Sequence, residues 1–161
     1  MKILVLSDSH SALSFMRRCI QSVNPDAIIH LGDHYDDAEV IAQEYPHIRL
    51  HQVPGNCDRG RCPMNAHEIL SYFIGGVRFY MTHGHRHFVK QGLYSLLADA
   101  RANQAQIVLF GHTHCAVCYQ EEDDLWVVNP GSCGSYSGTA AVVEIQDEKI
   151  SACRIIGQTD L

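Results

Sequence analysis

The chain has 161 residues, of which 46% are hydrophobic and 19% charged, so it is long enough to bury the core of one domain spanning residues 1–161. Its net charge of −6 disfavours a protein that binds long nucleic acids through a broad basic surface. No apolar run is long enough to cross a membrane, and the chain starts directly with a strand-like run, so we expect a cytoplasmic protein that does not associate with membranes.

The first third of the chain alternates strand-like and helical patterns, which is typical of an α/β protein. Short apolar runs predict buried strands at residues 2–7, 27–31 and 48–53. Apolar residues at helical spacing from Leu13 onward predict a helix after the first strand. Acidic residues suited to a first helical turn open a second helix near Asp36.

The middle of the chain contains a hairpin and a third helix. Residues 68–74 and 77–82 are strand-like and flank Gly75-Gly76, a pair that favours a tight turn. Leucines on one face predict a helix over residues 88–102, which leads into a buried strand at 107–110.

After His114 the pattern changes to short strands separated by tight polar turns. These strand-like runs cover residues 116–120, 125–128, 139–145 and 150–156. Without an intervening helix, they predict an antiparallel meander.

Residues with carboxylate, amide or imidazole side chains stand directly after five of these strands. They are Asp8, His10, Asp33, Asn56, His83, His112 and His114. Ligands of open α/β sheets bind at the carboxyl ends of the strands, so we expect these side chains to gather there. If the backbone stays extended past Gly111, His112 and His114 point the same way. The alternatives are a polar turn with two unrelated histidines and, for Asp8, the cap of the next helix.

This set of side chains suits two divalent metal ions. Asp33 lies between the other groups in the chain and is placed to bridge both ions. Two carboxylates leave about two positive charges on such a site, which attract a phosphate anion. Ions roughly 3.5–4 Å apart can also hold a bridging hydroxide, and the expected reaction is its in-line attack on phosphorus.

The blocks Asp8-x-His10, Gly32-Asp33, Gly55-Asn56-x-Asp58, His83-Gly84-His85 and Gly111-His112-x-His114 resemble the calcineurin-like metallophosphoesterase superfamily, most closely its small YfcE-like phosphodiesterases. The resemblance covers most of residues 1–132. It implies an α/β fold, a four-layer α/β/β/α sandwich of two mixed sheets flanked by helices, and a metal-dependent phosphoesterase that acts on small phosphodiesters.

The resemblance also implies ligand roles. Asp8, His10, Asp33 and His114 would hold one ion, and Asp33, Asn56, His83 and His112 the other. The expected metal is manganese, and a site rich in oxygen and nitrogen also admits iron, cobalt, nickel or zinc. Asp33, Asn56 and His85 are the candidate catalytic residues. His85 either contacts a substrate oxygen or supports the site from behind, and the sequence leaves both roles open.

One position departs from the superfamily pattern. Cys57 stands where many members have a histidine that protonates the leaving group, although the Asp that orients this histidine has a match in Asp36. A thiol is a poor acid for this task, so we expect a preference for leaving groups that need little protonation. For Asp58 we expect a structural role in closing the turn that presents Asn56.

Several other polar residues receive the simpler interpretation. His34 is expected to face solvent, and Ser132 is a minor candidate for the edge of the site. Seven cysteines, an odd number, indicate reduced thiols, and Cys115-x-x-Cys118 alone is weak evidence for structural zinc.

Two classes of function stay open, and a metal-dependent nuclease is a third possibility that the acidic balance and the absence of Lys/Arg clusters disfavour. The first is a phosphoesterase with a small phosphoester substrate. The second is a non-catalytic interaction module on the same fold, like the retromer subunit that resembles these enzymes but lacks the full set of histidines. Every ligand position is filled here, which favours the enzyme. An exposed edge strand also allows a homo-oligomer.

Overall fold

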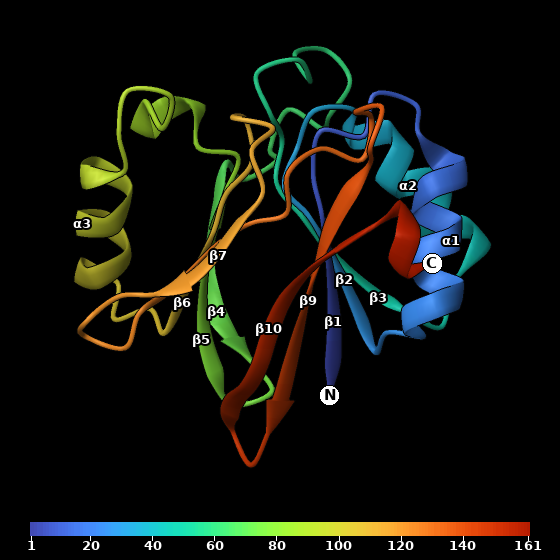
Figure 1. Cartoon of the computed structure of the whole chain (residues 1–161). Coiled ribbons are helices and arrows are strands. Elements are labelled where there is room, and N and C mark those ends of the chain that lie inside the picture. The colour runs from blue at the N-terminus through green and yellow to red at the C-terminus, as the bar shows by residue number, and fades with distance from the viewer.

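The computed structural model describes residues 1–161 as two five-stranded sheets that face each other, with helices on their outer sides (Figure 1). In spatial order, the first sheet contains β10 (Lys149–Gly157), β9 (Thr139–Gln146), β1 (Lys2–Leu6), β2 (Ala27–His30) and β3 (Arg49–Gln52). The second contains β4 (Ile69–Ile74), β5 (Val77–Thr82), β6 (Ile107–Leu109), β8 (Trp126–Asn129) and β7 (Val117–Gln120).

Both sheets are mixed. In the first sheet β1, β2 and β3 are parallel, and β9 and β10 are added as antiparallel strands. In the second sheet β5, β6 and β8 are parallel, with β4 and β7 as antiparallel edges. Helices α1 (Leu13–Val23) and α2 (Tyr35–Glu44) cover the first sheet, and α3 (Tyr94–Ala102) covers the second. The predicted four-layer α/β/β/α sandwich is confirmed.

The hydrophobic core has three parts because the sandwich has three interfaces between layers. The largest lies between the sheets, where alternate residues such as Ile3 and Val5 of β1 meet Phe79 and Met81 of β5. The intervening Leu4 and Leu6 face the helices instead. This alternation follows from the two-residue period of a strand, and burial on both faces explains why the central strands are apolar throughout.

The third helix begins later than its apolar spacing predicted, at Tyr94 and not near residue 88. Phe88 has a φ of 54° and Gly92 a φ of 151°, and neither value is compatible with a right-handed helix. Residues 88–93 therefore form an irregular segment ahead of α3. None of the helices is both long and apolar enough to cross a membrane.

The predicted meander after His114 is wrong. β7 and β8 form a hairpin in the second sheet, but the chain then crosses to the first sheet, where β9 pairs with β1. The sequence shows four short strands but not which strand edge each one meets. Across the interface, the thiol of Cys118 in β7 lies 2.9 Å from that of Cys153 in β10, whereas Cys115 is exposed.

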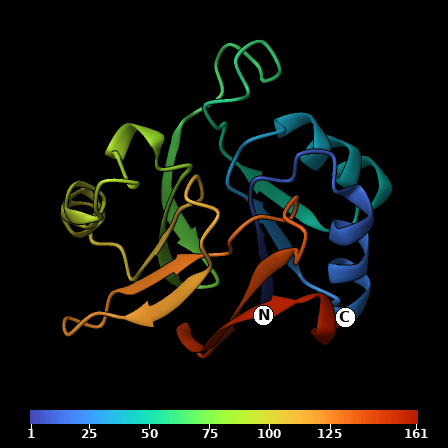
Figure 2. The same cartoon turned by 45° about the horizontal axis from the view of Figure 1, so that its top comes forward.

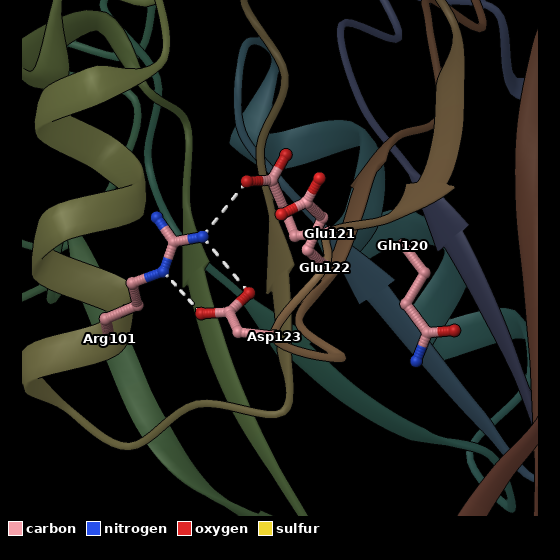
Figure 3. Close-up of a pocket in the computed structure, with 5 residues that line it drawn as sticks. All are labelled: Arg101, Gln120, Glu121, Glu122 and Asp123. Carbon is pink, nitrogen blue, oxygen red and sulfur yellow. Dashed lines mark hydrogen bonds and ion pairs between the residues drawn. The ribbon is translucent and has the colours of Figure 1, made fainter.

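Charged residues fix α3 to the β7–β8 hairpin at the edge opposite the strands' carboxyl ends. Arg101 of α3 donates to Asp123 at 2.7 Å and to Glu121 at 3.0 Å, while Gln120 points away from this group (Figure 3). These residues line a polar hollow of about 510 Å³. Its single cation, Arg101, is already paired with two of the three carboxylates that line it, so we assign the hollow a structural role.

Candidate functional site

All seven predicted site residues follow strands at one edge of the sandwich, and the loops that carry them meet over the interface between the two sheets (Figure 2). The first sheet delivers the residues that follow β1, β2 and β3. The second delivers those that follow β5 and β6. They are Asp8, His10, Asp33 and Asn56 from the first sheet, and His83, His112 and His114 from the second.

The backbone at this edge is not extended, so the geometry assumed for His112 and His114 is wrong. β6 ends at Leu109, and His112 and His114 have φ values of 68° and 59°. Asp8 and Asp33 also adopt positive φ, at 51° and 58°. A left-handed conformation costs a non-glycine residue about 1–2 kcal/mol. Strain of this kind concentrates at functional sites, where the surrounding structure imposes it.

Gly111 allows the ends of β1 and β6 to approach each other. A Cβ at this position would lie 2.0 Å from the Ser7 hydroxyl oxygen, so no other residue fits without movement. The close approach places the His112 N–H 3.1 Å from Oδ2 of Asp8, which also accepts from Ser7. Oδ1 of Asp8 is buried without a hydrogen-bond donor and lies 3.0 Å from Nε2 of His114.

His83 is fully buried, and its ring is held by the backbone of the first sheet. Nδ1 lies 2.7 Å from the carbonyl oxygen of Leu31, so Nδ1 carries the proton and Nε2 presents its lone pair. Around Nε2 lie three oxygens: one from Asn56 at 3.1 Å, one from Asp33 at 3.5 Å and one from Asp8 at 4.0 Å. A lone pair facing only acceptors is unfavourable unless a cation lies among them, either a metal ion or a second proton on the ring.

Asp58 joins the loops that carry Asp33 and Asn56. Its buried carboxylate accepts from the N–H groups of Asp33 at 2.9 Å, Tyr35 at 2.8 Å and Gly55 at 2.7 Å. The expected structural role is therefore confirmed, and it extends beyond the turn that presents Asn56. By fixing both loops, Asp58 sets the distance between two candidate metal ligands.

Asp33 is tuned to stay ionised. Burial acts to raise the pKa of its carboxyl, but the neighbouring His83 and the Cys57 N–H, 2.8 Å from Oδ1, outweigh burial and hold the pKa below its usual range. An ionised carboxylate is the form that binds a metal. This electrostatic balance therefore favours a cation at Asp33.

A group formed by His34, Asp36 and Asp37 brings its ligand atoms within 4.8 Å of one another but contains no predicted ligand. Two further groups of this kind are formed by the predicted ligands. One consists of Asp8, His10 and His114, and the other of Asp8, Asp33 and His83. The two groups share Asp8, whereas the resemblance assigns the shared position to Asp33. Asp33 nevertheless belongs to the second group together with His83, so both carboxylates are part of the cluster.

His34 does not face solvent as expected. Its ring packs edge-on against His10 with centroids 4.9 Å apart, and Nδ1 lies 3.7 Å from Asp37. Asp37 also accepts from the Ser9 hydroxyl and the Ser11 N–H, both at 2.7 Å. A buried carboxylate thus fixes the loop that carries His10, a role that the acidic start of α2 concealed in the sequence.

Two further residues fix the loops of the second sheet. Ser132 donates to the carbonyl oxygen of Asp8 at 2.8 Å, which confirms its predicted place at the edge of the site. Asn129, which sequence reasoning missed, donates to the carbonyl of Gly111 and the hydroxyl of Thr113, both at 3.0 Å. The only signal for Asn129 was its position at a strand end, where turn residues are common.

His85 and His112 stand beside His83 with ring centroids 5.5 Å and 5.1 Å from it. Burial lowers the pKa of both, with the His83 ring acting in the same direction, and the value for His112 falls to about 4. Both rings are therefore neutral near pH 7. Nδ1 of His85 is buried without a partner, and a cavity of about 540 Å³ adjoins His85 and Asn56.

Comparisons with known proteins agree with this arrangement. Residues 1–148 match the model of the calcineurin-like phosphoesterase superfamily domain. The chain is 30% identical to phosphodiesterase MJ0936 of Methanocaldococcus jannaschii, covering 91% of this chain and 93% of that protein. It is 32% identical to a probable metallophosphoesterase of Mycoplasma pneumoniae, covering 81% and 78% of the two chains.

A solved structure extends the comparison of the fold. Vps29 of Entamoeba histolytica, in complex with Zn²⁺, superposes with a TM-score of 0.74 over 98% of this chain and 99% of that chain. The two sequences are 18% identical, so this likeness concerns the fold alone.

Proposed function

Because the chain belongs to the calcineurin-like phosphoesterase superfamily and is similar to proteins named phosphodiesterase and probable metallophosphoesterase, we propose that it hydrolyses small phosphodiesters at a dinuclear metal centre. One observation carries the proposal: Nε2 of the buried His83 faces oxygens of Asn56, Asp33 and Asp8, with no donor among them. A divalent cation satisfies all four atoms at once. The name of the archaeal relative supports a phosphodiester as the substrate.

The donor set fits two ions of intermediate softness. Oδ1 of Asp8, buried without a partner, is available to a metal, as are the neutral imidazoles around it. We assign Asp8, His10, Asp33 and His114 to one ion and Asp33, Asn56, His83 and His112 to the other, and take manganese as the first metal to test. When bound, such ions supply a nucleophile at neutral pH and offset negative charge on the phosphoryl group.

The chain's own residues complete the site. Leu31 holds His83 in the tautomer that leaves Nε2 free, and Asp58 fixes the spacing of Asp33 and Asn56. His85 lines the cavity beside Asn56, so we propose that its ring contacts an oxygen of the substrate.

The site has only a poor proton donor for the leaving group. Burial and the nearby Asp33 raise the pKa of the Cys57 thiol, and a thiol is a poorer donor to oxygen than an imidazolium. Asp36, which would orient an imidazole at this position, lies 3.6 Å from Arg61 instead. The site therefore favours substrates whose leaving group departs without a proton, such as aryl phosphodiesters.

The test is a panel of phosphodiesters and phosphomonoesters assayed on metal-stripped protein to which each metal is restored separately. We expect hydrolysis of nitrophenyl phosphodiesters with manganese and none without metal. Activity should fall steeply as the pKa of the leaving group rises. Metal-independent hydrolysis, or no hydrolysis with any of manganese, iron, cobalt, nickel and zinc, would refute the proposal.

Cys57→His tests the proton donor directly. General acid catalysis is typically worth about 10²–10⁴ in rate, so the variant should recover part of this factor for alkyl esters and little for nitrophenyl esters. Cys57→Ser is the matched control, because it keeps the size of the side chain without adding an imidazole. If the wild type cleaves both ester classes equally fast with chemistry rate-limiting, another residue is the acid, and His85 is the first to examine.

The charge of the chain supports a small substrate. The net charge is −6, and the positive charge that would attract a phosphate group comes from the proposed metal ions. We therefore propose that long nucleic acids are not substrates. A non-catalytic interaction module, the alternative that Vps29 illustrates, is less well supported, because all seven candidate ligand positions are filled here.

A further inference from the structure

The irregular segment 88–93 folds back over the His83-Gly84-His85 turn. Gly84 has a φ of 100°, and a Cβ there would lie 3.0 Å from the side chain of Val89. Val89 is 5% exposed, and its N–H donates to the Gly84 carbonyl at 3.4 Å. Because Val89 is packed on the turn that carries two site histidines, the next residue, Lys90, is held beside the site.

An apolar groove of about 470 Å³ is lined on one side by Lys90 and on another by the loop that follows β6. Thr113, which lies between His112 and His114, forms part of its lining, so the groove borders the loop that carries these two candidate ligands. Its apolar walls are Val89, Leu93, Phe110, Val117 and Tyr119. A concave, mostly apolar pocket with one charged group at its rim is the usual form of a small-molecule site.

Lys90 has no ionic partner, although the chain is acidic overall. Lys90 also lines the groove described above, so its ammonium group is available to an anion there. A phosphate group is such an anion, and lysine binds phosphate as a point charge.

On the basis of the proposed function, we propose that the groove is the subsite for an aromatic or short apolar arm of the phosphodiester, with Lys90 at its rim holding the phosphate. The position of the groove beside the loop that carries His112 and His114 favours a substrate arm over a protein partner. Its volume falls within the range of about 300–1,000 Å³ that is typical of small-molecule pockets. The substrates selected are then diesters with one apolar substituent.

The first experiment compares nitrophenyl diesters that share a leaving group and differ in the other arm. The second arm is methyl, phenyl or 5′-thymidyl, so the series separates a small arm from a simple aryl arm and a nucleoside. The ratio of kcat/KM values for the phenyl and methyl esters is measured in each variant, because intrinsic reactivity is then the same throughout. Tyr119→Ser and Val117→Asn should lower this ratio about tenfold.

Lys90→Met should raise KM about tenfold for all three esters with a smaller change in kcat, and Lys90→Arg should recover most of the loss. Tyr94→Ser and Lys149→Met are the matched controls. Tyr94 is 89% exposed and lies outside the groove, and Lys149 begins β10. Both controls should behave as the wild type does. An unchanged phenyl-to-methyl ratio in the groove variants overturns the proposal.

Binding of phosphonates tests the groove independently of turnover. We expect calorimetry on the manganese-loaded protein to show about tenfold tighter binding of phenylphosphonate than methylphosphonate, and Tyr119→Ser to remove the difference. If the wild type hydrolyses none of the diesters, the proposed function fails, while this measurement still decides the groove. Equal affinities overturn the inference. So does a dimer that Tyr119→Ser dissociates, because the groove is then an interface between two copies of the chain.

Discussion

The two sheets contribute different chemistry to the same edge. The first sheet supplies both carboxylates, the amide and one imidazole, whereas the second supplies imidazoles alone. The two sets are Asp8, Asp33, Asn56 and His10 from the first sheet, and His83, His112 and His114 from the second. The first sheet thus contributes both negative charges, and the second contributes most of the nitrogen ligands. The site is assembled only when the two sheets pack against each other.

The loops of the two sheets are also fixed by different means. In the first sheet a buried carboxylate, Asp58, accepts three backbone N–H groups. In the second sheet a buried amide, Asn129, donates to a carbonyl and a hydroxyl and accepts the Gly131 N–H at 2.9 Å. A charged acceptor forms stronger hydrogen bonds than a neutral amide, so the first sheet holds its ligands more rigidly.

Removing negative charge from the first sheet should have the largest effect. Asp33→Asn should lower kcat/KM on the order of 10³-fold, since stabilisation by metal is worth several kcal/mol and each tenfold in rate about 1.4 kcal/mol. If Asp33 bridges, elemental analysis should show the loss of both ions in Asp33→Asn and of one in Asp8→Asn. The reverse pattern would identify Asp8, which the two ligand groups share, as the bridge. Asp36→Asn, in the first turn of α2, is the control.

Removing the residues that fix the loops should have the next largest effect, on stability. Asp58→Ala leaves three buried N–H groups unpaired and should lower the free energy of unfolding by about 3 kcal/mol or more. Asn129→Ala should cost about 2 kcal/mol, because the three hydrogen bonds of its amide involve no charged group. Urea denaturation of metal-free protein measures both. Equal losses would contradict the difference in rigidity between the sheets.

The first sheet also contains a buried histidine that should make stability depend on pH. Burial lowers the pKa of His30 in β2 from 6.5 to about 4. Between these values the unfolded chain binds a proton that the folded chain does not. The stabilisation is therefore complete above pH 6.5 and is lost as pH falls toward 4, by at most about 3 kcal/mol.

Urea denaturation of metal-free protein between pH 4.5 and 7 tests this dependence. His30→Gln should flatten the slope, and His47→Gln, at an exposed position, should preserve it. The His30 ring resonances should also show no titration above pH 5 in the folded protein. A ring that titrates near 6.5 would contradict the prediction without any variant.

The imidazoles of the second sheet should produce the smallest effect, a shift of the acid limb of activity. Protons and metal ions compete for the nitrogens of His83, His112 and His114, so activity should decline as the pH falls. Raising the manganese concentration should move this decline to lower pH, toward the pKa of about 4 that burial gives His112. If the pH of this decline does not change with metal concentration, the decline reflects a general acid or base of the protein instead.

The fold was predictable as far as local patterns reach. Apolar runs of strand length identified β1, β2 and β6, and Gly75-Gly76 identified the β4–β5 hairpin. The same patterns failed where a strand's partner is distant. The crossing from β8 to β9 depends on the edge of β1, more than 130 residues away in the chain, with Leu4 opposite Val142. No turn residue between the two strands indicates this partner.

The residues of the site were predictable because they follow strands, but their geometry was not. His112 and His114 would point the same way only on extended backbone, whereas both residues adopt left-handed conformations after Gly111. His34 was expected in solvent, whereas packing places it against His10. Because Phe88 and Gly92 have positive φ values, α3 starts only at Tyr94, and the irregular segment before it contains Lys90.

The sequence by itself determined which chemical groups stand at the strand ends, because strand period and polarity are local properties of the chain. Only the tertiary structure decided how those groups face one another. The His83 ring reaches the Leu31 carbonyl of the opposite sheet, and Asp8 meets the backbone of His112, more than 100 positions along the chain. These contacts arise from the packing of two separate layers. A pattern read along one strand contains no information about the distance to the other layer.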